Sequence, residues 1–138
     1  MKNKNNMSSE IILIQFQNSL TSFFDEMIEL FPKEPDFIKI RIFIKDQIEI
    51  QEVMDVFTYN INRVDVNNND ETIKKMIKER HEIDIMESPI LTELFPKDKI
   101  IYYKKFWNSP KFFSEDKKII WKWMDSFVGI SEKYNKLK

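Results

Sequence analysis

The stretch SEDKKIIWKWMDSFVGISEKY, residues 114–134, decides the fold class. Its apolar residues recur every three or four positions, which is the spacing of one face of an α-helix. These residues are Ile119, Trp123, Phe127, Ile130 and Tyr134. Ser114 is a favoured N-cap residue, and the acidic side chains that follow it suit the positive end of a helix dipole. The stretch therefore predicts a long amphipathic helix near the carboxyl end.

The same spacing recurs along the rest of the chain and predicts an all-α fold. Residues 38–44 also alternate in the way a β-strand does, so helix and strand both stay open there. We predict a single compact bundle of five or six helices over residues 9–138, preceded by a disordered tail of residues 1–8. The other helices are expected at about residues 9–31, 37–64, 70–77 and 97–108, with one or two helical turns at 90–95.

Several residue types that carry chemistry are scarce in the 138 residues. There is no cysteine, which excludes disulfides, a thiolate zinc site and a cysteine nucleophile. The single glycine excludes the glycine-rich loops that bind phosphate groups. The uninterrupted apolar runs are far shorter than the about 20 residues that span a bilayer. We predict no cofactor, no membrane partner and no secretory signal.

An enzyme is the weaker interpretation of the polar residues. His81 is the only histidine; it could act as a general base, but a surface or capping role is favoured. A metal-dependent nuclease would use Asp36 and Glu49, yet Gln51 stands where that motif has a lysine. The acidic groups Asp25, Glu26, Glu29 and Asp84, Glu87 could hold Mg²⁺, but solvated helix faces explain them better. We predict no metal site and no catalytic residue.

Charge and aromatic residues are unevenly distributed. Residues 97–138 hold 11 basic and 5 acidic side chains, whereas residues 1–96 hold 11 basic and 18 acidic ones. Ten of the 19 aromatic residues also lie in this basic third. Lysines interleaved with aromatic rings are typical of surfaces that bind single-stranded nucleic acid. The absence of arginine from this third and the sequence pI of about 5.9 argue against that function.

Two tryptophans in the basic third indicate a protein interface. Trp121 and Trp123 lie about 200° apart around one helix, so they cannot face the same core. One of them is expected to be partly exposed or to lie against a different helix. An exposed tryptophan among lysines is typical of a residue that dominates a protein interface. The candidate partner-binding residues are Trp121, Trp123, Lys117, Lys118, Lys122, Tyr102, Tyr103 and Trp107.

Two phrases resemble a group of viral proteins. FFDEMIELFPKEPDF at residues 23–37 and FSEDKKIIWKWMDSFVGIS at residues 113–131 are similar to small all-helical proteins that recur in large nucleocytoplasmic DNA (giant) viruses. The excess of Phe, Ile, Asn and Lys over Gly, Ala and Arg fits the AT-rich genome of such a virus. The resemblance implies a helical fold, a viral source and a location in the host cytoplasm or the viral factory. It carries over no catalytic residue, because the group has no assigned activity.

Together these observations predict a non-enzymatic helical module, either an adaptor or an accessory subunit. Its predicted partner is another viral or host protein, or a second copy of the chain. The alternative is a nucleic-acid-binding accessory protein that uses the same basic, aromatic-rich third. The two differ in their expected salt dependence, since binding to phosphates weakens steeply as salt rises.

Overall fold

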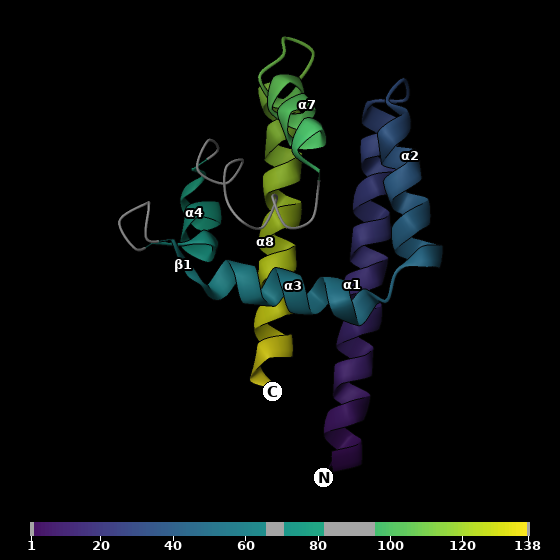
Figure 1. The fold of residues 1–138 in the computed structure, drawn as a ribbon, viewed down its shortest axis with the longest axis vertical. Coiled ribbons are helices and arrows are strands. Elements are labelled where there is room, and N and C mark those ends of the chain that lie inside the picture. The colour runs from purple at the N-terminus through teal and green to yellow at the C-terminus, as the bar shows by residue number, and fades with distance from the viewer. Residues whose placement is uncertain (1, 66–70, 82–95, 138) are drawn as a thin grey trace. The chain divides into compact units, whose positions relative to one another are not determined.

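A computed structural model describes residues 2–65, 71–81 and 96–137, and the fold is all-α, as predicted (Figure 1). Within these ranges the structure also contains one short antiparallel strand pair that was not predicted, with Val64 opposite Thr72. The elements are α1 (Lys2–Leu30), α2 (Pro35–Ile42), the π-helix η1 (Phe43–Gln47), α3 (Ile50–Asn62), β1 (Val64–Asp65), β2 (Glu71–Thr72), α4 (Ile73–Glu79), α7 (Lys97–Trp107) and α8 (Ser114–Lys136).

The helices fall into two compact units. The N-terminal unit comprises Met1–Val56 and Gly129–Lys138, and the aromatic unit comprises Phe57–Val128. Helices α3 and α8 contribute residues to both units. One domain over residues 9–138 and a disordered tail over residues 1–8 stay predictions.

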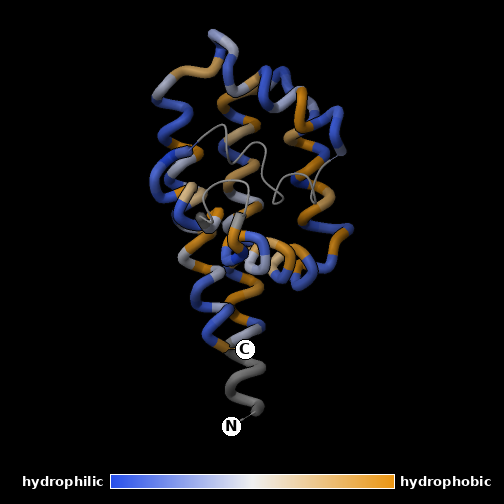
Figure 2. The backbone as a smooth tube through the Cα atoms, turned by 60° about the vertical axis from the view of Figure 1, so that its left-hand side comes forward, coloured by the Kyte–Doolittle hydropathy of each residue, from blue (hydrophilic) through white to orange (hydrophobic). Residues whose placement is uncertain are grey.

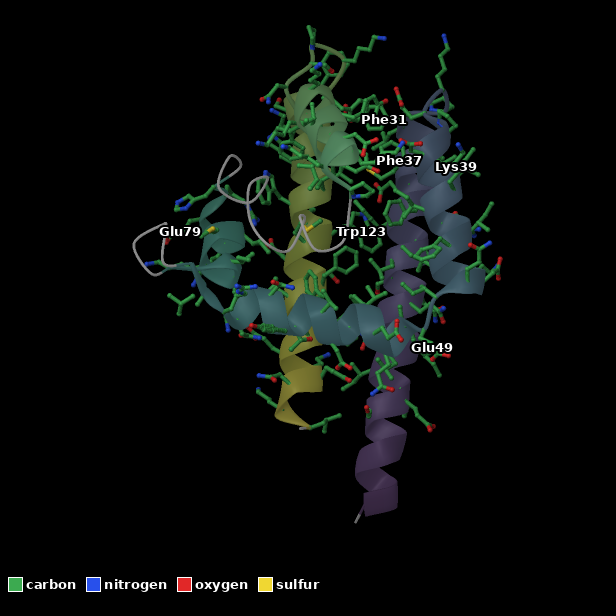
Figure 3. The ribbon with its side chains drawn as sticks, viewed as in Figure 1. Phe31, Phe37, Lys39, Glu49, Glu79 and Trp123 are labelled. Carbon is green, nitrogen blue, oxygen red and sulfur yellow. The ribbon has the colours of Figure 1, made fainter. Side chains whose placement is uncertain are left out.

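The N-terminal unit is built on the antiparallel pair of α1 and α2 (Figure 1). The α1 backbone is helical from Lys2, upstream of the predicted residue 9, because no proline or glycine interrupts residues 2–8. Pro32 ends α1 and Pro35 occupies the first turn of α2, where a missing N–H group costs no hydrogen bond. Four phenylalanine rings of this unit contact one another in series, and Figure 3 labels the last two: Phe23, Phe24, Phe37 and Phe31.

The predicted single helix over residues 37–64 is wrong. α2 passes into η1, and Ile48 then takes an extended conformation with φ −113° and ψ 146° before α3 begins. The break changes the phase of the buried face. Ile44 and Met54 are both buried, yet on an uninterrupted helix they would lie about 80° apart. Residues 38–44 are helical throughout, so the strand alternative is also wrong.

The aromatic unit contains α4, α7 and the first half of α8. Thr72 caps α4, with its hydroxyl oxygen accepting a hydrogen bond from the Lys75 N–H at 3.2 Å. Helix α7 ends within one residue of its predicted end, and α8 begins at the predicted Ser114. The described residues do not include Asp70, where the helix predicted at about 70–77 starts, the predicted turns at 90–95, or the carboxylates Asp84 and Glu87.

Hydrophobic and hydrophilic residues alternate along the helices with short periods (Figure 2). Helices α3 and α8 are the clearly amphipathic ones, with an apolar face for packing and a polar face for water. Within the described ranges, no helix is both long enough and apolar enough to cross a membrane.

Candidate interaction surface

Six aromatic side chains in the aromatic unit form a continuous series of ring contacts, which we call the aromatic chain. Its members come from α7, from the turn after it and from α8. Neighbouring ring centroids lie between 5.1 and 6.4 Å apart, which is the usual range for favourable aromatic pairs. In order of contact the members are Tyr103, Tyr102, Phe106, Phe112, Trp107 and Trp121.

One end of the aromatic chain is fixed by Arg80. This residue follows α4 in the left-handed conformation, with φ 63°, and its guanidinium carbon lies 5.0 Å from the centroid of Trp121. Its Nη1 and Nη2 atoms donate hydrogen bonds to the two carboxylate oxygens of Asp125, at 2.8 and 2.7 Å. Nη1 also donates to the carbonyl oxygen of Ile77 at 2.7 Å. Arg80 thus connects the end of α4 to one face of α8.

The ion pair changes the acidity of both partners. The hydrogen bond from Arg80 is the main cause that lowers the pKa of Asp125 below its ordinary value, and the charge of Arg80 acts in the same direction. The same hydrogen bond raises the pKa of Arg80. Both side chains are partly exposed, so solvent screens the attraction and limits its contribution to stability.

A second cation lies against Trp107, the next ring of the aromatic chain. The ammonium nitrogen of Lys117 is 5.0 Å from the centroid of Trp107. A cation at this distance from the face of an indole is attracted by the negative potential of the ring. The pair Trp107 and Trp121 therefore has one cation against each ring.

Within the aromatic chain, burial is greatest at Trp107 and Phe112 and lowest at Tyr102. Trp107 and Phe112 are buried, whereas Tyr102 is 39% exposed and its neighbour Ile101 is 47% exposed. Lys97 and Lys105 precede and follow Ile101 by four residues, so these three side chains lie along one face of α7, and both lysines are exposed. We call the set Lys97, Ile101, Tyr102 and Lys105 the α7 surface.

The structure brings together five of the eight predicted partner-binding residues. Four are members of the aromatic chain, and Lys117 contacts it. Trp123 belongs to a different cluster, because its ring stacks on Phe127 at 6.0 Å. Lys118 pairs with Glu115 at 3.1 Å, and Lys122 is exposed on α8. Trp121 and Trp123 are both half-buried, and their ring neighbours differ.

Sequence reasoning missed the Arg80–Asp125 pair and the apolar position Ile101. One signal was available for Asp125, which follows Trp121 by four residues. A carboxylate and an indole with this spacing share a helix face and can hold one cation between them. No such local signal exists for Arg80, since its side-chain partners Trp121 and Asp125 are 41 and 45 residues away in the sequence.

The residues considered for catalysis have ordinary structural partners. Arg41 donates a hydrogen bond from Nε to Asp25, and His81 Nε2 lies 3.5 Å from Glu79 Oε1. Asp36 lies in the first turn of α2, and Glu49 is exposed immediately before α3. Among the described residues, no three His, Asp or Glu side chains are grouped so that they could hold a metal ion.

Comparison with known proteins adds no family to this description. The chain matches no family model, no curated protein and no solved structure at a significant level. The functional interpretation therefore rests on the geometry and charge of the aromatic unit.

Proposed function

We propose that this chain is a non-enzymatic adaptor or accessory subunit that binds another protein through the α7 surface. The observation that carries the proposal is the exposure of Ile101 and Tyr102 between two lysines of one helix face. The helix face is supported by the aromatic chain, so little conformational freedom is lost when a partner binds. An apolar centre with a charged rim is the usual anatomy of a protein interface.

The aromatic contacts favour a protein partner over a nucleic acid. A single strand binds by stacking its bases on open ring faces. Tyr102 instead stacks on Phe106 with an interplanar angle of 21°, and Trp107 contacts Phe112, Trp121 and the Lys117 ammonium group. The rings are thus largely used within the protein. Residues 97–138 also lack arginine, the residue best suited to bidentate phosphate contacts.

We further propose a viral source and a location in the host cytoplasm or the viral factory. Both proposals rest on the resemblance of residues 23–37 and 113–131 to helical proteins of giant viruses. They make an infected-cell extract the suitable source of partners.

The experiment is affinity capture from such an extract, with and without nuclease, using the full chain. The test variant is the double change Ile101→Ser and Tyr102→Ser. The matched control is Ile38→Ser and Ile42→Ser on α2, where both isoleucines are 44% exposed and lie beside the exposed Lys39. We expect a captured protein to be lost with the test variant, retained with the control and unaffected by nuclease. Capture that nuclease abolishes would instead establish the nucleic-acid alternative.

A further inference from the structure

We infer that the partner segment bound by the α7 surface is acidic, with an apolar side chain between two carboxylates. This inference rests on the proposed function and names the chemistry of the partner. The sequence supplies the first observation. Residues 97–128 hold eight basic and four acidic side chains, a net charge of +4.

Three of these four acidic side chains are engaged within the protein. Asp125 binds Arg80, and Glu115 pairs with Lys118. Asp116 accepts a hydrogen bond from the N–H group of Phe113 at 3.3 Å, at the start of α8. The fourth, Asp98, is exposed in the first turn of α7, so one carboxylate on this stretch remains available to a partner.

Several lysines of the same stretch have no such engagement. Within the described parts of the chain, four exposed lysines form no ion pair and no hydrogen bond: Lys97, Lys105, Lys111 and Lys122. Two of the four belong to the α7 surface. The charge that the α7 surface presents to a partner is thus mainly positive, and carboxylates complement it.

The spacing of the α7 surface defines the spacing expected in the partner. Lys97 and Lys105 are eight residues apart, which corresponds to about 12 Å along a helix axis. Ile101 lies midway between them on the same face. The complementary segment therefore places two carboxylates about 12 Å apart, with an apolar side chain between them. On a helical partner, two Glu residues separated by about two turns, with Leu at the turn between, meet this requirement.

The test measures binding of a labelled synthetic helical peptide to the full chain by fluorescence anisotropy. The peptide has about 16 residues on an alanine background, which allows helix formation. It carries Leu between two Glu residues spaced as above, and a second peptide replaces both Glu with Gln. We expect the Gln peptide to bind about three- to tenfold more weakly, the range expected for two partly exposed ion pairs. Equal binding of the two peptides contradicts the inference without involving any change in the protein.

Variants of the chain provide the reciprocal test. We expect the double change Lys97→Glu and Lys105→Glu to weaken binding of the Glu peptide, and a Lys-containing peptide to restore binding. The matched control is Lys39→Glu on α2 and Lys45→Glu on η1, both exposed, which should leave the affinity unchanged. A competition experiment compares a thymidine oligonucleotide with unlabelled peptide. If the oligonucleotide displaces the labelled peptide at a lower concentration than the unlabelled peptide does, the inference is overturned in favour of nucleic acid. If capture depends on Ile101 and Tyr102 but the Glu and Gln peptides bind with equal affinity, the inference fails and the proposed function stands.

Discussion

The N-terminal unit contains a phenylalanine cluster, made of Phe23, Phe24, Phe31 and Phe37, and the aromatic unit contains the aromatic chain. The two groups are built from similar residues but differ in the contacts that they can make. Each combines contacting rings with one arginine–aspartate pair, Arg41–Asp25 in the first and Arg80–Asp125 in the second. The first cluster contains only phenylalanine, whereas the second contains tyrosine and tryptophan and has a cation against each indole.

The difference in residue type suits the phenylalanine cluster to packing and allows the aromatic chain to reach the surface. Phenylalanine has no polar atom, so its best position is between helices, where water is excluded. Tyrosine and tryptophan bury most of a ring and keep a polar group that can face solvent or a partner. Lysine and arginine stems can cover such rings and leave their charged ends in water. The aromatic chain therefore combines buried rings with the exposed Tyr102, which can contact another molecule, while the phenylalanine cluster holds α1 against α2.

The largest expected effects come from removing a buried ring in either region. Phe24 and Trp107 are both 8% exposed, so they form a matched pair. We expect Phe24→Ala and Trp107→Ala each to lower the free energy of unfolding by about 3–5 kcal/mol, through lost burial and the cavity that remains. Urea unfolding followed by far-UV circular dichroism measures the loss. All three tryptophans lie in the aromatic unit, so fluorescence of the Phe24→Ala variant reports that unit separately.

The control for this pair is Phe113→Ala. Phe113 is 66% exposed, and surface truncations of this kind usually change stability by less than about 0.5 kcal/mol. A loss below about 1 kcal/mol at Trp107 would show that the buried rings of the aromatic chain do not stabilise the aromatic unit as the phenylalanine cluster stabilises the N-terminal unit.

A smaller effect of opposite sign is expected at Gly129, where α8 passes from the aromatic unit into the N-terminal unit. Glycine weakens a helix interior, and a methyl group at this position meets no atom within 4 Å. Gly129→Ala should therefore raise the free energy of unfolding by about 0.5–1 kcal/mol. The same urea titration measures it. A destabilised variant would mean that α8 needs the flexibility of glycine between the two units.

The sequence was sufficient to predict the positions of those helices whose apolar spacing is uninterrupted and whose ends carry local signals. The helix predicted to start near Ser114 begins at that residue, and the helix predicted to end near residue 31 ends at Leu30, where Pro32 follows. The break near Ile48 could not be predicted in this way, because residues 37–64 contain no proline or glycine. There the buried faces of two short helices differ in phase, and only their tertiary contacts select the break.

The candidate surface was predictable in composition but not in geometry. The excess of lysine and aromatic residues after Lys97 indicated the right third of the chain. Which rings touch, and which lysines lack partners, depends on contacts between residues far apart in sequence. Arg80 is the clearest case, since its role comes from Trp121 and Asp125 rather than from its own neighbours.

The two arginine–aspartate pairs give a smaller test of the comparison. Arg80 donates two hydrogen bonds to Asp125 and lies over Trp121, whereas Arg41 donates one hydrogen bond to Asp25. We expect Asp125→Asn to cost about 1 kcal/mol, because a bidentate pair has more favourable geometry than a single contact. Asp25→Asn should cost less than about 0.5 kcal/mol. Thermal unfolding of the two isosteric variants compares them, and equal losses would remove the distinction.

Acid should gradually remove the contribution of the Arg80–Asp125 pair. Because the hydrogen bond from Arg80 lowers the pKa of Asp125 in the folded protein, the unfolded chain binds this proton more readily. The stabilisation is therefore fully present above the unfolded pKa of about 3.9 and is lost as the pH falls through the lower folded value. We expect the stabilities of the wild type and Asp125→Asn to differ by a constant amount from pH 7 to about pH 5 and to converge in stronger acid. Urea midpoints measured across this range test the expectation. A difference that persists undiminished at about pH 2 would assign the effect of the variant to packing against Trp121 instead of to charge.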